Sequence, residues 1–272
     1  MHTSLIIVSS VKAKTKNLDK KAYRNLVISA TLWGLSPFFY KQGLLFVSIL
    51  IFLGLRFAIG ALCIFITERK KFVRLTLKII TIITAFALLD ALLVNIVYSF
   101  AIQRTTILHA SIIQLSVPFL VYFFAAIILR EKPHRIVLFG STIAVIGLAV
   151  IVFANSSVSS PSTGLQNIGD IVMFGCVCLS ALSIVLGRKV LSKVKKLPSE
   201  QLGFMEYAIS AVPFFVIIAL HGSWHSLVTI PPIAWVWILA AAIISGSLPI
   251  TFYYRSVKRA GRRNFLHKVR AS

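Results

Sequence analysis

The sequence is poor in charged residues, and it is poorest in acids. Of its 272 residues 13% are charged, with 7 Asp or Glu against 29 Lys or Arg. A soluble protein carries about 25% charged residues, because its surface must stay polar. Here 58% of the residues are apolar and the mean hydropathy is +0.90. These values exclude a soluble fold, and the long apolar runs predict an all-α, polytopic helical membrane protein rather than a β-barrel of short alternating strands.

Other features that the sequence lacks speak against metal binding, ATP hydrolysis and catalysis. The three cysteines, Cys63, Cys176 and Cys178, lie inside apolar runs without metal-ligand spacing, so we expect small buried side chains and no metal. No glycine-rich phosphate loop follows a strand, which speaks against ATP hydrolysis and against a cofactor. The few acids are scattered, whereas a membrane enzyme needs convergent acids, histidines or metal ligands. We therefore expect no enzyme.

Eight apolar runs are long enough to cross a bilayer as helices of about 20 residues. They are Asn25–Leu45, Val47–Thr67, Ile79–Ala101, Thr106–Leu129, Ile136–Ala154, Ile168–Gly187, Gly203–Leu220 and Ile233–Tyr254.

The net charge of +22 is explained by membrane orientation rather than by nucleic-acid binding. Twenty-six of the 29 basic residues lie in alternate segments: both tails and the connections 68–78, 130–135 and 188–202. Basic connections stay in the cytosol, which predicts an inner (plasma) membrane protein with both termini cytosolic. An even number of spans fits this orientation. We expect the partners to be the lipid bilayer and a small solute, with no nucleic acid and with a homodimer as an open possibility.

Two similar motifs indicate an internal repeat. Tyr98 opens YSFAIQR at the end of the third run, and Tyr253 opens YYRSVKR at the end of the eighth. If these positions correspond, the unit has five spans, and the second copy runs in the opposite sense across the membrane, as in many secondary transporters. The second copy would then lack its last two spans. A shortened form, a truncated product and an illusory repeat are the alternatives.

Several motifs resemble, in order and spacing, the EamA-type members of the drug/metabolite transporter superfamily. The resemblance covers about Asn25 to Gly261. It rests on LWGLSPFFYK with Trp33 and Lys41, the Leu55-Arg56-Phe57 triplet, Pro118 in the fourth run, Glu131, Gly140, Gly147 and Gly169-Asp170. It implies ten helices in two inverted halves that move metabolites, amino acids, nucleotide-like compounds or toxic organic molecules. It also implies the domain bounds: tail 1–24, first repeat 25–154, external loop 155–167, incomplete second repeat 168–261 and tail 262–272.

Polar side chains inside apolar runs are the candidates for substrate binding, because they are costly in lipid. Asp90 lies near the middle of the third run. Arg56 lies about 14 Å below the outer end of the second, at about 1.5 Å per residue, so we expect it to pair with Asp90 or to face the same cavity. Such a pair could serve substrate binding, proton coupling or structure alone.

Asn95, Tyr98 and Gln114 are further lining candidates, with interhelical hydrogen bonding as the alternative. Trp33 is a lining candidate or a packing residue, and Lys41 is expected to extend outward. Glu206 is expected near the cytosolic end of its run, where it would stay hydrated. The leading hypothesis is a secondary transporter working by alternating access. The alternatives are an inactive or accessory member of the same family and, less favoured, a membrane enzyme.

Overall fold

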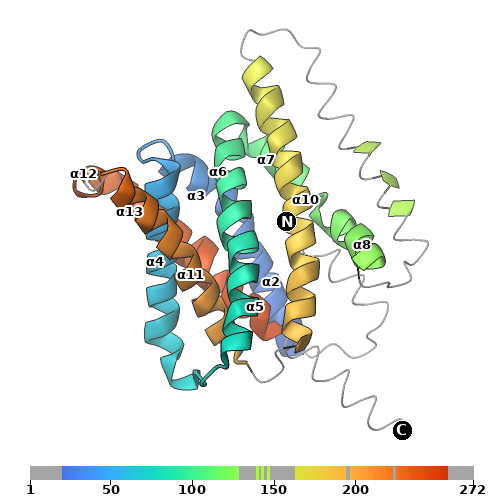
Figure 1. Cartoon of the computed structure of the whole chain (residues 1–272). Coiled ribbons are helices and arrows are strands. Elements are labelled where there is room, and N and C mark those ends of the chain that lie inside the picture. Colours follow the sequence, from blue (N-terminus) through green and yellow to red (C-terminus); the bar gives the residue numbers. More distant parts are fainter. Residues whose placement is uncertain are drawn as a thin grey trace.

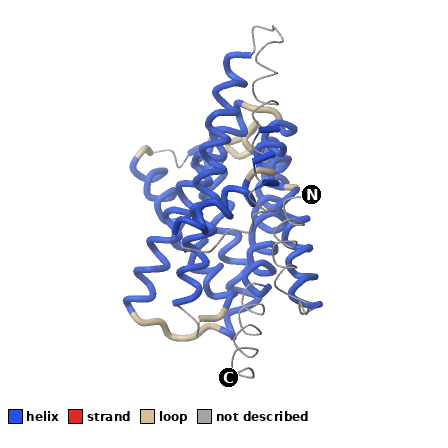
Figure 2. The backbone as a smooth tube through the Cα atoms, turned by 90° about the vertical axis from the view of Figure 1, so that its right-hand side faces the viewer, coloured by secondary structure: helices blue, strands red, loops and turns tan. Residues whose placement is uncertain are grey.

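The computed structural model describes residues 20–128, 163–193, 197–222 and 225–256, with six further positions between 139 and 147. All secondary-structure elements of the described residues are helices, and none is a strand (Figures 1 and 2). The elements of the first half (residues 20–128) are α2 (Lys20–Gly34), α3 (Ser36–Gly43), α4 (Ile49–Glu68), η1 (Arg69–Lys71), α5 (Leu77–Ala87), η2 (Leu88–Val94), α6 (Asn95–Arg104), α7 (Ile107–Gln114) and α8 (Val117–Ile128). Those of the second half (residues 163–256) are α10 (Thr163–Lys193), α11 (Ser199–Leu220), α12 (His225–Val228), α13 (Pro232–Ala242) and η4 (Ile243–Ser247), followed by a helical stretch over 248–256.

Six helical segments of the described chain are long and apolar enough to cross a membrane. They are Ile49–Lys71, Leu77–Arg104, Ile107–Ile128, Ile168–Gly187, Glu200–Leu220 and Pro232–Ser256. The chain is thus a multi-pass membrane protein, but a count of eight spans is not confirmed. The first expected run is divided into α2 and α3 by a turn at Leu35, and the fifth, Ile136–Ala154, lies mostly outside the described residues.

Local sequence explains where several helices begin and end. The Ser48 side chain caps α4 by accepting a hydrogen bond from the Ile51 N–H, and Thr106 caps α7 in the same way. Pro118 stands in the first turn of α8, where its missing N–H is not needed. Gly222 follows α11 with φ 63°, a left-handed conformation that favours glycine.

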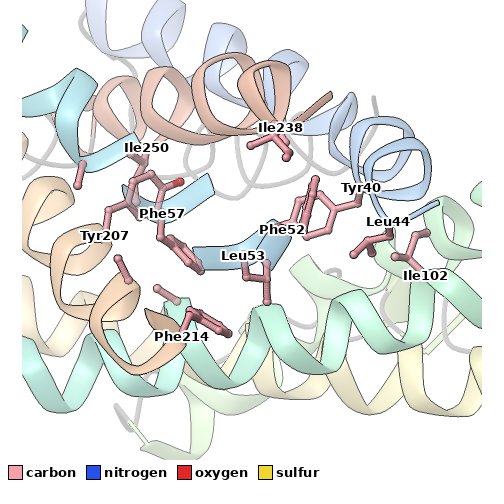
Figure 3. Close-up of a cluster of buried hydrophobic side chains, with 14 of the residues drawn as sticks. Tyr40, Leu44, Phe52, Leu53, Phe57, Ile102, Tyr207, Phe214, Ile238 and Ile250 are labelled. Carbon is pink, nitrogen blue, oxygen red and sulfur yellow. The ribbon is translucent and has the colours of Figure 1, made fainter. Parts of the chain in front are cut away.

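The two halves meet along α4 and α11, the pair of helices in most extensive contact. Small residues allow this approach, since Gly54 lies against Phe214 and Gly60 against the Tyr207 ring. Figure 3 shows Phe57 between Tyr207 and Phe214, with ring centroids 5.1 and 5.9 Å away. Large apolar side chains also cover the outside of the bundle, as expected of surfaces that face lipid; examples are Leu62, Ile66, Phe123, Ile127, Ile171, Val212 and Val236.

Two of the spans contain a π-helical segment in mid-span, η2 in Leu77–Arg104 and η4 in Pro232–Ser256. A π-helix displaces the usual carbonyl partners, so the freed carbonyls need other donors. At η2 two neighbouring helices supply them. The Ser210 hydroxyl of α11 donates to the Ala87 carbonyl at 3.2 Å, and the Cys176 thiol of α10 donates to the Val94 carbonyl at 3.5 Å.

Candidate transport site

A buried arginine stands at the contact of the two halves. Arg56 of α4 is 5% exposed, and its guanidinium carbon lies 5.0 to 5.6 Å from the ring centroids of Tyr40, Phe57 and Tyr207. These distances are those of cation–π contacts. Its Nε and Nη1 have no hydrogen-bond partner. Tyr40 comes from α3 and Tyr207 from α11, so the aromatic side chains around Arg56 come from both halves.

Tyr40 connects this arginine to the polar face of the third span. Its hydroxyl donates to Asn95 Oδ1 at 2.6 Å, and Asn95 Nδ2 donates to the Asp90 carbonyl at 3.3 Å. Tyr98 packs edge-on against Tyr40 at 4.9 Å, and its hydroxyl accepts a hydrogen bond from Gln114 Nε2 at 3.3 Å. Three predicted lining residues, Asn95, Tyr98 and Gln114, therefore lie together near Tyr40, which sequence reasoning did not single out.

Asp90, the acid of the third span, has other partners than Arg56, with which it was expected to pair. Asp90 Oδ1 accepts a hydrogen bond from the Ser183 hydroxyl of α10. No ion pair joins Asp90 to Arg56 in the described part of the chain. On α11, which packs against η2, Glu206 Oε2 accepts a hydrogen bond from the Tyr254 hydroxyl.

The expectation of a hydrated Glu206 is wrong. Its side chain is 1% exposed, because α11 begins at Ser199 and its first turns already pack against α4. Glu206 thus belongs to the interior, where it lies near both Asp90 and Arg56. We name the connected residues the polar cluster: Tyr40, Arg56, Asp90, Asn95, Tyr98, Gln114, Ser183, Glu206, Tyr207 and Tyr254.

Two residues of the opening motif lie away from this cluster. Trp33 is 37% exposed and packs at a tilt against the Tyr253 ring, with centroids 5.3 Å apart, so it contacts the last span rather than Arg56 or Asp90. Lys41 does not extend freely outward as expected. Its ammonium donates to the carbonyls of Ile102, Gln103 and Thr105 at 2.8, 3.2 and 2.8 Å, where the end of α6 leaves carbonyls without partners.

Comparison with known proteins decides the family. The model of the EamA-like transporter family matches residues 20–153 and 167–265, most of the chain. The chain belongs to the EamA-like transporter family. A solved crystal structure, described only as that of a protein, superposes with a TM-score of 0.58 at 15% identity, covering 88% of this chain and 79% of its own. That likeness shows the fold alone. A search of curated proteins gave no match.

Ion pairs join the two halves of this EamA-like chain at one end of the bundle, here called the basic end. Arg255 donates to Glu200 Oε1 at 2.8 Å and to Glu68 Oε1 at 2.6 Å. Lys71 pairs with Glu68 and lies 3.7 Å from Glu200. Beside them Gln201 makes two hydrogen bonds to the Val73 backbone.

A smaller contact joins the halves at the opposite end. Asp170 at the start of the α10 span accepts hydrogen bonds from the Thr105 hydroxyl and from His109 Nδ1, the latter at 2.8 Å. Gly169 beside it touches the backbone of Arg104, since a Cβ there would lie 2.5 Å from the Arg104 carbonyl. The family-like Gly169-Asp170 pair therefore holds α10 against the α6–α7 connection.

Sequence reasoning did not assign Tyr40, Ser183, Tyr207 and Tyr254 to the polar cluster, and it expected Glu206 to lie outside it in water. The signal for Glu206 and Tyr207 was available, because both interrupt an otherwise apolar run and share the span with Gly203 and Ser210. Tyr40 and Ser183 carry no such signal. Aromatic and hydroxyl side chains are common in membrane helices, and their role depends on which way each helix is turned.

Proposed function

We propose that this chain is a secondary transporter that moves a small metabolite or organic solute across the inner (plasma) membrane by alternating access. The observation that carries the proposal is membership of the EamA-like transporter family, together with a buried to half-buried polar cluster between two groups of spans. Buried polar groups in membrane spans are costly and are commonly kept for a substrate or an ion.

An inverted repeat is supported by the two π-helical segments. Ten residues separate Leu88, the start of η2, from Tyr98, and ten separate Ile243, the start of η4, from Tyr253. The YSFAIQR and YYRSVKR motifs and the two π segments thus give the same alignment independently. We propose that residues 25–154 and 168–261 are two repeats of opposite orientation, as in many carriers.

The helix contacts support the same symmetry. The α4 span contacts the α13–η4 span as the α11 span contacts the α5–η2 span, and α3 contacts α13 as α10 contacts α6. The two contacts of each pair are interchanged when every span of the first repeat is exchanged with its counterpart in the second. The counterparts are α3 and α10, α4 and α11, and the span of α5, η2 and α6 with that of α13 and η4. Since α4 and α11 are then equivalent, the pseudo-two-fold axis passes between them, next to Arg56 and Glu206. Substrate sites of inverted-repeat carriers lie at this interface near the midplane.

We propose that Arg56, Asp90, Asn95, Tyr98 and Gln114 contact the substrate. Arg56 would attract an anionic or strongly dipolar group, and the tyrosine rings would hold an apolar part. Trp33, exposed beside Tyr253, would lie at the edge of the path. Alternating access requires that the ties at the two ends break in turn. The Glu68–Arg255–Glu200 network and the Asp170–Thr105–His109 contact both join the halves, and they lie at opposite ends.

Uptake by the full chain reconstituted in liposomes tests the proposal. We expect saturable uptake of at least one solute from a panel of amino acids, organic anions and aromatic cations, and loss of that uptake in Arg56→Ala. Arg74→Ala is the matched control, because Arg74 is exposed at the basic end. A well-folded protein that moves no solute of a broad panel would contradict the carrier function.

A further inference from the structure

The connection between α4 and α5 lies at the basic end, at the lower edge of the bundle in Figure 1, and is rich in basic residues. Five of them, all exposed, lie within ten positions: Arg69, Lys70, Lys71, Arg74 and Lys78. Glu68, the acid beside them, is already paired with Lys71 and Arg255. Within the described part of the chain, the other four basic side chains form no ion pair. The connection therefore presents positive charge that the protein itself does not balance.

Contacts with the second half hold this connection in one shape. Gln201 of α11 accepts a hydrogen bond from the Val73 N–H at 2.9 Å and donates to the Val73 carbonyl at 2.7 Å. The Phe72 ring packs against Phe204 of α11, with centroids 5.2 Å apart, and Leu75 packs against the core. Because these contacts fix the inward side of the connection, its basic side chains are displayed on a formed surface of the protein.

Large apolar side chains are exposed beside these charges. Ile66, in the last turn of α4, is 66% exposed, and Leu77, the first residue of α5, is 80% exposed. The Arg69 guanidinium carbon lies 6.0 Å from the ring centroid of Phe65, which is itself exposed. These residues stand where two membrane-crossing segments end and begin, at the boundary between hydrocarbon and water. A basic and apolar surface at this level can contact the headgroup and the acyl chains of the same lipid.

We propose that the α4–α5 connection binds an anionic phospholipid. The lipid phosphate contacts Arg69, Lys70 and Arg74, and the acyl chains lie along Ile66 and Leu77. Arg and Lys side chains are the usual partners of phosphate in proteins. A zwitterionic lipid is attracted less, because the cation of its headgroup already balances its phosphate. The hydrogen bonds between Gln201 and Val73 place this lipid where the two halves meet. The inference does not depend on the carrier function proposed above.

Fluorescence quenching by lipid beside the connection tests the proposal. An uncharged fluorophore is attached to Thr76→Cys, an exposed position of the connection, in the full chain with Cys63→Ser, Cys176→Ser and Cys178→Ser. The protein is reconstituted in phosphatidylcholine vesicles that contain a small fraction of quenching lipid, with a nitroxide on its acyl chain. The quenching lipid is either phosphatidylglycerol or phosphatidylcholine. We expect phosphatidylglycerol to bind at this position roughly tenfold more strongly, and high salt to reduce the difference.

Matched variants locate the binding. Lys70→Gln together with Arg74→Gln should remove most of the preference for phosphatidylglycerol, because each exposed cation near the surface contributes to it. Lys70→Arg together with Arg74→Lys keeps both charges and should keep the preference. The same fluorophore on Gln103→Cys, at the opposite end of the same span, should show little preference.

Equal quenching of the Thr76→Cys fluorophore by the two lipids would overturn the proposal. An equal preference at Gln103→Cys would overturn it too, since the attraction would then belong to the whole protein. Retention of the preference after both Lys70→Gln and Arg74→Gln would place the lipid on other residues. Inorganic phosphate, compared with chloride at the same ionic strength, should leave the preference unchanged. Its selective loss in phosphate would show a site for a soluble anion in place of a lipid.

Discussion

At the scale of single residues, Arg56 is costly to the fold. Removing a guanidinium from water costs several kcal/mol unless it is paired, and each buried N–H without a partner adds about 1–3 kcal/mol. Cation–π contacts with Tyr40, Phe57 and Tyr207 return about 0.5–2 kcal/mol each, so they offset only part of this. A residue retained at such a cost is better explained by binding than by stability.

Tyr254→Phe should destabilise the protein. It removes the hydroxyl that donates to the buried Glu206 carboxyl while keeping the ring. A buried acceptor that loses its donor costs about 1–3 kcal/mol. The midpoint of unfolding in a mixed-micelle denaturant titration measures the change. Tyr23→Phe, at a 38% exposed site near the start of α2, is the control and should leave the midpoint in place. Equal shifts in both variants would contradict a supporting role for Tyr254.

Lys41→Met should also destabilise the protein. The ammonium serves three carbonyls at the end of α6, and hydrogen bonds to a charged group are worth about 1.5–3 kcal/mol each when partly buried. Because some carbonyls would regain water, we expect a loss of about 1–3 kcal/mol in all. The same unfolding titration measures it, with the exposed Lys78→Met as control. An unchanged midpoint for Lys41→Met would show that water replaces the lysine without cost.

At the scale of elements, small residues decide how closely the helices approach. Gly54 and Gly60 let α4 lie against α11, and Gly169 lets α10 lie against the α6–α7 connection. In lipid there is no hydrophobic force to bring helices together, so such close backbone contacts carry much of the association energy.

Gly169→Ala should loosen the end of the bundle opposite the basic end. An added Cβ would lie 2.5 Å from the Arg104 carbonyl and 2.8 Å from the Thr105 nitrogen, and backbone atoms cannot turn away as a side chain can. We expect a loss of about 1–3 kcal/mol from overpacking. Gly175→Ala on the same helix meets no atom within 4 Å and should be neutral or slightly stabilising. Thermal unfolding in detergent compares the two, and a neutral Gly169→Ala would mean that the backbones separate easily.

The membrane spans could be predicted well from the sequence, whereas most contacts of the candidate site could not. The run Ile168–Gly187 was predicted correctly as a span, which lies within the longer helix α10, and the resemblance in family was confirmed. Hydropathy succeeds here because each run must satisfy its backbone within lipid. The break at Leu35 and the burial of Glu206 were not predicted. Both depend on how one helix sits against another, which the composition of a run does not determine.

At the scale of the whole molecule, contacts between the halves occur at both ends and in the middle. The ion pairs of the basic end are partly exposed, with Lys71 54% and Arg255 29% accessible, so each is worth about 1 kcal/mol or less. Weak ion pairs at this end suit the proposed alternating access. Three segments that sequence analysis expects in the cytosol meet at this end, which supports the proposed orientation.

Cysteine labelling should show opposite accessibility at the two ends of one span. In a background of Cys63→Ser, Cys176→Ser and Cys178→Ser, we expect Gln103→Cys to react with an impermeant thiol reagent added outside intact cells. Thr76→Cys at the other end of the same span should react only after the cells are opened. Both positions are exposed and lie at the two ends of the span Leu77–Arg104. The reverse pattern would invert the orientation, and labelling of both from outside would contradict the span.

The π-helical segment η2 has a geometric consequence for the span that contains it. The extra residue in that turn shifts the phase of the helix, so positions before Leu88 and after Val94 do not belong to one helical wheel. Counting by 3.6 residues from α5 would assign Asn95 and Tyr98 to wrong faces, although the structure places both toward Tyr40. Deleting one residue of η2 would restore a regular α-helix and rotate all of α6 by about 100° about its axis, turning its polar side chains from the cluster toward lipid.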